Sequence, residues 1–251
     1  MMKKLWQIAL AAAMASLLTN CASVSDPADA YKNETQQQIY SKGKAALQDK
    51  SYGEAIKRFE ALDVQYPYGE ATENAQFFLI YAYYMKEDYA LSLAAADRFI
   101  RLHPANQHVD YAYYMRGIAN YYQNLGILER LFAVDMSNRD LEQVKKSYLD
   151  FQMVVNNFPN SRYAPAAHQY LVYLRNVLAD HELHVAEYYY GRKAYVAAAN
   201  RASDVVRYYQ GAPAVIPALK QMAKAYEKLG LSQLAQDTYR VMQFNGVALK
   251  K

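Results

Sequence analysis

The sequence is poor in the residues that build loops and cross-links. Its 251 residues include 9 Gly and 7 Pro, which disfavours a loop-rich all-β fold. A single cysteine, Cys21, excludes an internal disulfide framework and a cysteine-based zinc site. The 28 basic and 24 acidic residues are spread along the chain, unlike the clustered basic face of a nucleic-acid-binding protein, so no nucleic acid partner is expected. A composition that is 53% hydrophobic and 21% charged is typical of a globular protein.

The first 20 residues have the pattern of a bacterial export signal. Two lysines precede an uncharged stretch over residues 5–18, which is shorter than the ~20 apolar residues of a membrane-spanning helix. Cys21 follows directly and resembles the acylated cysteine of a lipobox; the alternative is an ordinary cleaved signal beside an incidental cysteine. Ala22, where an Asp would retain a sorted lipoprotein in the inner membrane, favours the outer membrane. We therefore expect a signal peptide over 1–20, a lipidated Cys21 and a protein anchored by lipid at the periplasmic face of the outer membrane.

The residues after the expected anchor, 21–35, are polar and without periodicity, which predicts a flexible tether. Beyond them one pattern recurs: a small residue, a small or aromatic residue four places later, an apolar residue three beyond, and often Pro after five more. This spacing places the side chains on one face of a helix that Pro then ends. The copies are Ala55-Phe59-Leu62-Pro67, Ser92-Ala96-Phe99-Pro104, Ser147-Phe151-Val154-Pro159, Ala198-Ala202-Val205 with Pro213, and Ala235-Tyr239-Met242 without Pro.

A second helical segment precedes each copy, which predicts an all-α tetratricopeptide-repeat superhelix of about five helix-turn-helix repeats. These first helices are expected over 37–47, 74–85, 111–124, 167–191 and 219–229. Gly43 stands twelve residues before Ala55, where two antiparallel helices must approach closely. The predicted organisation is repeats 1–2 over 36–109, repeat 3 over 110–166 with an insertion at 126–140, and repeats 4–5 over 167–246.

Tyrosine is the abundant residue, with 26 copies, and its runs fall in the expected first helices. Consecutive tyrosines point around a helix, so we expect most of them to pack between helices. The alternative is that a share of them lines a groove for extended peptides, to which aromatic rings with polar tips are suited.

Motifs for catalysis are scarce. The sequence has neither a Gly-rich phosphate loop nor a Gly-x-Ser-x-Gly elbow, and no cofactor is expected. His181, His184 and Glu187 have the i, i+3, i+6 spacing of one helix face and could form the metal site of a hydrolase. We expect instead a solvated helix face, and thus neither a metal site nor an enzyme. The charge-dense segment 135–140 is either a capped helix start or a partner-contacting loop.

An ordered set of segments carries a resemblance that runs from about residue 36 to the early 240s. The chain resembles the BamD (ComL) family of lipoproteins, which belong to the outer-membrane β-barrel assembly machinery. The segments are 61–69, 79–84, 97–102, 115–117, 134–135 with 139–140, 158–161, 185–189 and 196–201.

The resemblance implies a non-catalytic scaffold. In this family the N-terminal repeats receive unfolded outer-membrane proteins, and that role would fall on Asp63 and Tyr66. The C-terminal repeats dock accessory assembly lipoproteins and the periplasmic domains of the barrel-forming subunit, BamA. The docking arginine of the family matches Arg201, whose planar fork can pair with a carboxylate. The alternative function is that of another repeat lipoprotein, acting in pilus assembly or cell division.

Overall fold

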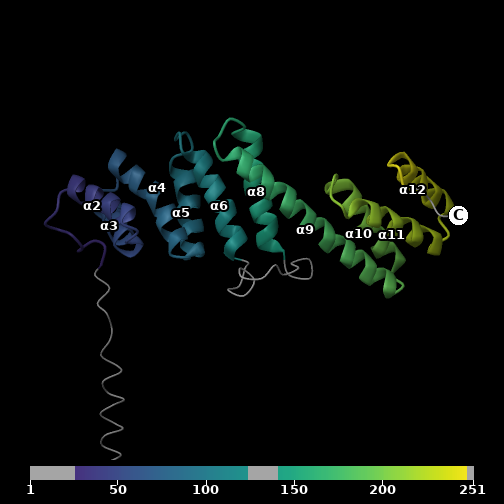
Figure 1. Cartoon of the computed structure of the whole chain (residues 1–251). Coiled ribbons are helices and arrows are strands. Elements are labelled where there is room, and N and C mark those ends of the chain that lie inside the picture. Colours follow the sequence, from purple (N-terminus) through teal and green to yellow (C-terminus); the bar gives the residue numbers. More distant parts are fainter. Residues whose placement is uncertain (1–25, 124–140, 248–251) are drawn as a thin grey trace, which may run out of the picture. The chain divides into compact units, whose positions relative to one another are not determined.

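The computed structural model describes residues 26–123 and 141–247, which form helices and turns without a strand (Figure 1). None of the helices in this part of the chain is both long and apolar enough to cross a membrane. The helices are α2 (Gln36–Gln48), α3 (Tyr52–Gln65), α4 (Glu70–Met85), α5 (Tyr89–Leu102), α6 (Val109–Gln123), α8 (Glu142–Asn157), α9 (Ala164–Gly191), α10 (Tyr195–Tyr208), α11 (Val215–Lys228) and α12 (Ser232–Phe244).

The described helices follow one another as five pairs, four of which are joined by a short turn, so the predicted all-α tetratricopeptide-type fold is confirmed. The first helix of each pair coincides with a segment expected from the sequence, and the second carries the recurring small-residue pattern. Successive helices pack against each other, as α5 does with α6, α6 with α8, and α10 with both α9 and α11.

Proline ends the second helix of the first three pairs. The residues before these prolines, Tyr66, His103 and Phe158, are the C-caps of α3, α5 and α8, with φ of −134°, −130° and −128°. The ring of a proline disfavours the helical conformation in the preceding residue, so each helix stops at the same place in its repeat.

The turn inside a repeat also has a common geometry. Lys50, Glu87, Lys193 and Gly230 each follow a first helix and have positive φ, at 58°, 62°, 62° and 71°. A left-handed residue after the last helical turn is a usual way to end a helix, and glycine is the residue that adopts it without strain. Three of the four repeats make this turn with a charged, non-glycine residue.

Close approach of the two helices in a repeat depends on glycine at two equivalent positions. The ring of Phe59 packs over Gly43, where an added Cβ would lie 2.7 Å from Phe59 Cε1. Phe151 packs over Gly117 in the same way, with a corresponding distance of 2.9 Å. The close approach predicted at Gly43 is thus present, and the aromatic ring of the facing helix fills the space that the missing side chain leaves.

In repeats 2 and 3 the small residue of the recurring pattern also forms a hydrogen bond with the facing helix. Ser92 Oγ donates to the Ile80 carbonyl oxygen at 2.9 Å, and Ser147 Oγ donates to that of Gly117 at 2.8 Å. Both serines are fully buried, so these bonds satisfy hydroxyls that would otherwise be costly to bury.

The chain divides into two compact units, one up to Ala75 and one from Gln76 onward. In the first unit, residues 26–34 form turns that lie against α3, although 21–35 was expected to be a flexible tether. Tyr31 donates its hydroxyl to Glu54 at 2.9 Å and its ring stacks under the Arg58 guanidinium, while Gln65 Nε2 donates to backbone carbonyl oxygens of the same turns. Residues 26–34 carry no periodic pattern, because side chains of α3, and not a local helix, hold this segment.

The second unit is organised around α9, whose 28 residues are twice the length of most other helices. Its first half packs with α6 and α8 in a core that includes Phe151 and Leu174. Its second half packs with α10 and α11 in a core that includes Leu183 and Val205. One continuous helix of ~42 Å therefore belongs to both cores.

Candidate protein-interaction site

Arg201 lies in α10 and pairs with α9. Its Nη1 donates to Glu182 Oε2 at 2.8 Å; the Arg201 side chain is 44% exposed, whereas that of Glu182 is 8% exposed. The hydrogen bond and the charge of Glu182 raise the pKa of the Arg201 guanidinium above its ordinary value. The buried carboxylate thus orients an exposed, permanently charged guanidinium.

The surface around Arg201 suits a protein contact. Asp204 and Tyr208 follow Arg201 at helical spacing on the same side of α10, and Tyr208 is 63% exposed. A guanidinium has five N–H donors, and Glu182 accepts a hydrogen bond from one of those of Arg201. This arrangement can present the remaining donors to a carboxylate of another chain, beside an exposed aromatic ring.

The structure brings Asp63 and Tyr66 together at the end of α3, in the first unit. Both are partly buried, and the backbone carbonyl oxygen of Tyr66 accepts the Thr72 hydroxyl at 2.5 Å. Two large side chains next to them are exposed: Val64 at 53% and Tyr68 at 87%. Asp63 and Tyr66 therefore belong to the first unit and Arg201 to the second.

Several predicted features lie outside the described residues: the signal peptide, Cys21 and the whole insertion at 126–140 with its charge-dense segment 135–140. The proposed ligands of the metal-hydrolase alternative are described. His181 is partly buried on α9, while His184 and Glu187 are exposed. Within the described ranges, no three His, Cys, Asp or Glu side chains are grouped as a metal ion would require.

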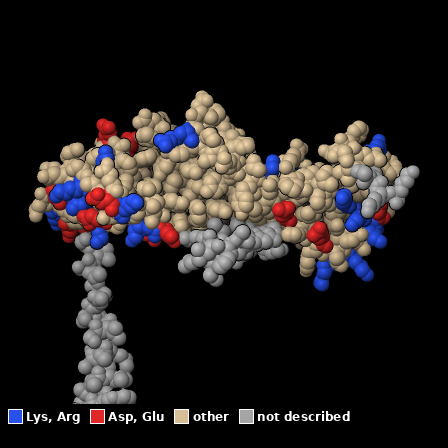
Figure 2. Space-filling model, in the orientation of Figure 1, with Lys and Arg blue, Asp and Glu red and all other residues tan. Residues whose placement is uncertain are grey.

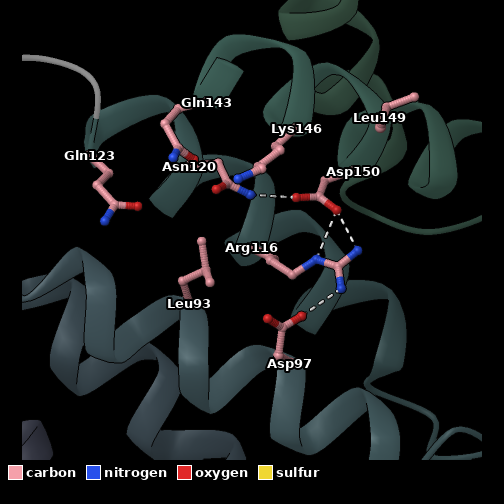
Figure 3. Close-up of a pocket in the computed structure, with 9 residues that line it drawn as sticks. All are labelled: Leu93, Asp97, Arg116, Asn120, Gln123, Gln143, Lys146, Leu149 and Asp150. Carbon is pink, nitrogen blue, oxygen red and sulfur yellow. Dashed lines mark hydrogen bonds and ion pairs between the residues drawn. The ribbon is translucent and has the colours of Figure 1, made fainter.

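A polar network around the buried carboxylate of Asp150 joins α5, α6 and α8, and it was not among the sites predicted from the sequence (Figure 3). Arg116 donates through Nε and Nη2 to Asp150 Oδ1, at 2.8 and 2.5 Å, and through Nη1 to Asp97 Oδ1 at 2.7 Å. Asn120 Nδ2 donates to Asp150 Oδ2 at 2.8 Å. Burial raises the pKa of Asp150 above its usual value although Arg116 and Asn120 act against this. One sequence signal was present: Asp150 interrupts the apolar stripe of its helix.

The charged residues of the visible face are unevenly distributed (Figure 2). Both signs gather over α2 and α3 and again over α10 to α12, whereas the surface over α6, α8 and the first half of α9 carries few charges. The charge pattern of this face is therefore mixed rather than basic.

The comparisons with known proteins give the family. A profile described as "Outer membrane lipoprotein" (YfiO) matches residues 32–241, which is more than half of the chain. The chain belongs to this family. The resemblance to the BamD family is also confirmed, because relatives from that family are similar to this chain over almost its whole length.

Three of these relatives bear the name "Outer membrane protein assembly factor BamD". The protein of Vibrio cholerae is 37% identical, over 92% of this chain and 94% of its own length. Those of Pasteurella multocida and Neisseria meningitidis are 34% and 35% identical, over 97% and 95% of this chain and 92% and 91% of their own lengths. Among solved structures, the crystal structure of MamA protein aligns over 87% of this chain and 100% of the MamA chain. At 15% identity and a TM-score of 0.36, this match supports no conclusion about fold or function.

The tyrosine runs of this YfiO-family chain are mostly packed. Of the nine tyrosines at 81–84, 111–114 and 188–190, Tyr188 is exposed and the others are partly or fully buried. Aromatic contacts run from Phe77 through Tyr111, Tyr163, Tyr114, Phe151 and Tyr170 to Tyr121. Burial raises the pKa of Tyr170 to about 12. Packing between helices therefore accounts for most of these tyrosines.

Proposed function

We propose that this outer membrane lipoprotein is a non-catalytic scaffold that helps to fold and insert proteins into the outer membrane. The observation that carries the proposal is the similarity to BamD proteins: 37% identity to the relative from Vibrio cholerae over more than nine tenths of both chains. A scaffold built from helical repeats also suits the task, because its long surface can hold several partners at once.

The second unit would dock the barrel-forming subunit, BamA, through Arg201. An exposed arginine that a buried carboxylate holds in place loses little conformational freedom when it pairs with a further carboxylate. The periplasmic domains of the barrel-forming subunit would supply that carboxylate. Accessory assembly lipoproteins would bind the same unit.

The first unit would receive unfolded outer-membrane proteins at the end of α3. Val64 and Tyr68 expose apolar and aromatic surface beside Asp63 and Tyr66. Such a mixture of aromatic, apolar and acidic groups suits an extended chain of variable sequence. The lipid anchor on Cys21 would keep both surfaces at the periplasmic face of the outer membrane.

The docking surface is tested by Arg201→Glu. The substitution reverses the charge that meets the partner and removes the donor to Glu182. We expect the barrel-forming subunit to be lost from affinity purifications of the protein out of detergent-solubilised membranes. Arg240→Glu makes the same charge change on α12, where it likewise removes an ion pair, with Asp237, and it should retain the subunit. Circular dichroism of both variants reports whether helix content is preserved, and undiminished co-purification with Arg201→Glu would remove Arg201 from the site.

The anchor is tested by Cys21→Ala. Without the thiol no acyl chain can be attached, so the protein should move from the membrane fraction to the soluble periplasmic fraction. A variant that stays firmly in the membrane fraction after a salt wash would show that another feature anchors the chain.

A further inference from the structure

Three helix ends of the second unit meet at one edge. The last turn of α9, the first turn of α10 and the last turn of α11 share a small core, so the turn between α9 and α10 lies beside the end of α11. The members of this core are Ala198, Ala199, Ala225, Tyr189, Tyr190, Tyr195 and Tyr226. We call the surface around it the basic edge and define it by its four cations, Arg192, Lys193, Lys224 and Lys228.

The cations of the basic edge are not neutralised by neighbouring side chains. All four are exposed, and none forms an ion pair with another residue of the described part of the chain. The acidic residues on the same helix turns are Glu187 and Glu227, and the carboxylate of Glu227 already accepts the Tyr239 hydroxyl at 2.7 Å. Arg201 and Arg240 of the same unit, in contrast, are each paired with a carboxylate.

The basic edge continues as a row of lysines along α11. Lys220, Lys224 and Lys228 stand four residues apart, and all three are exposed. Like charges at this spacing repel each other and destabilise a helix. An anionic surface beside the row would replace this repulsion by attraction. In Figure 2 basic side chains project from the lower edge of the region of α10 and α11.

Exposed aromatic and apolar side chains accompany the cations. Tyr188, in the last turn of α9, is 63% exposed, and Val196, in the first turn of α10, is 60% exposed. Leu231 follows the end of α11 closely and is exposed as well. Tyrosine is enriched where a membrane meets water, because its ring suits the apolar phase and its hydroxyl the aqueous one. Cations beside exposed apolar side chains are typical of a surface that lies on an anionic bilayer.

The side chains of the basic edge fit lipid headgroups better than a defined acidic site on a protein. Lysine carries a compact charge on a flexible stem, which can follow phosphate groups as they move within a bilayer. A carboxylate at a fixed position is better matched by an oriented guanidinium such as that of Arg201. A bilayer is also within reach, because the chain belongs to a family of outer membrane lipoproteins.

We infer that the basic edge binds the phosphate-bearing headgroups of anionic phospholipids, so that repeats 4 and 5 contact the membrane surface. This contact would be additional to the proposed lipid anchor on Cys21. The inference goes beyond the proposed function, because it involves neither the barrel-forming subunit nor an unfolded protein. It rests on the membership of the outer membrane lipoprotein family alone.

The test measures how the chain from residue 22 onward, which lacks the expected signal peptide and the acylated cysteine, floats with vesicles. Vesicles of phosphatidylcholine and phosphatidylglycerol in equal amounts should bind it, whereas phosphatidylcholine alone should not, and high salt should release it. A basic residue near an anionic surface contributes about fivefold in affinity, so Lys224→Gln/Lys228→Gln should bind at least about tenfold more weakly. Lys86→Gln/Lys145→Gln makes the same charge change at two exposed lysines of the second unit and should bind like the unmodified chain.

A second measurement reports which surface meets the bilayer. The one tryptophan of the sequence, Trp6, is absent from this chain, so an introduced tryptophan is the only one present. The emission of Val196→Trp should shift to the blue when anionic vesicles are added. Leu149→Trp is the matched control, because Leu149 on α8 is also 60% exposed, and its emission should stay that of a ring in water.

The following outcomes would overturn the inference. They are equal binding of the two double variants, binding to phosphatidylcholine alone, binding that high salt leaves intact, and an equal blue shift in both tryptophan variants. The full-length Lys224→Gln/Lys228→Gln protein should retain the barrel-forming subunit and the accessory lipoproteins in affinity purifications. Their loss would assign the basic edge to a protein partner and overturn the inference too. Failure of the unmodified protein to retain the barrel-forming subunit would instead refute the proposed function.

Discussion

Replacing Arg116 by methionine is expected to lower the free energy of unfolding by about 3 kcal/mol. The substitution leaves the Asp150 carboxylate 6% exposed, with Asn120 as its remaining donor. Removing one member of a buried ion pair usually costs about 3–5 kcal/mol, and the bond from Asn120 places this case at the lower end. Methionine fills a similar volume, so little of the loss should come from a cavity.

The double variant Arg116→Met/Asp150→Leu distinguishes a charge effect from a packing effect. Asp150→Leu alone should cost about 2 kcal/mol, since Arg116 keeps Asp97 and, at 24% exposed, reaches water. With both charges gone, no buried charge is left unpaired, and the double variant should cost about 2 kcal/mol less than the sum of the two single variants.

The assay is urea unfolding of the full-length protein in detergent, followed by circular dichroism. Lys146→Met is the control, because it removes an exposed ion pair with Glu142 from the same helix and should cost at most about 0.5 kcal/mol. A loss for Arg116→Met no larger than that of this control, or a double variant whose cost equals the full sum, would refute the reasoning.

The pH dependence of the Arg116→Met variant gives an independent readout. Without the guanidinium, burial raises the pKa of Asp150 further above its ordinary value of 3.8. A carboxyl whose pKa is raised in the folded state favours folding while it is protonated and loses this contribution as pH rises through its folded pKa. The difference in unfolding free energy between variant and unmodified protein should therefore shrink as pH falls from neutral toward 4.

Two further predictions concern the turns and the tyrosines. Lys193→Gly should raise the free energy of unfolding by about 0.5–1 kcal/mol, because glycine adopts the φ of 62° found there without strain. Urea unfolding measures this gain, and Lys193→Ala, which keeps a Cβ, should not show it. Burial raises the pKa of Tyr170 from 10 to about 12. Between these two pH values the phenol of Tyr170 ionises in the unfolded chain but not in the folded one, so the free energy of unfolding should fall as pH rises. Tyr170→Phe should show a smaller fall in urea unfolding at alkaline pH; an equal fall in both proteins would contradict the assigned burial.

The sequence predicts the helices well because their signals are local. The small-residue pattern recurs on one helix face, and a proline two residues beyond α3, α5 and α8 ends each helix at a common position. Gly43 predicted close packing of two helices, because only a residue without a side chain permits such an approach. These features depend on neighbours within one repeat, which spacing along the chain reveals.

The features that the sequence did not predict depend on distant residues. The turns at 26–34 are held by Arg58 and Gln65 of α3, so composition alone made them look like a tether. Arg116 meets Asp97 and Asp150 across three helices, and more than thirty residues separate Arg116 from Asp150 in the sequence. The resemblance pointed to Arg201, but its buried partner Glu182 required the structure.

The central claim is that this outer membrane lipoprotein works within the assembly machinery for β-barrel proteins. The most direct test is affinity purification of the full-length protein from detergent-solubilised outer membranes, with the bound chains identified by mass spectrometry. We predict that a β-barrel subunit with periplasmic domains co-purifies in stoichiometric amount. A pilus or cell-division protein in its place, with no such subunit present, would contradict the claim.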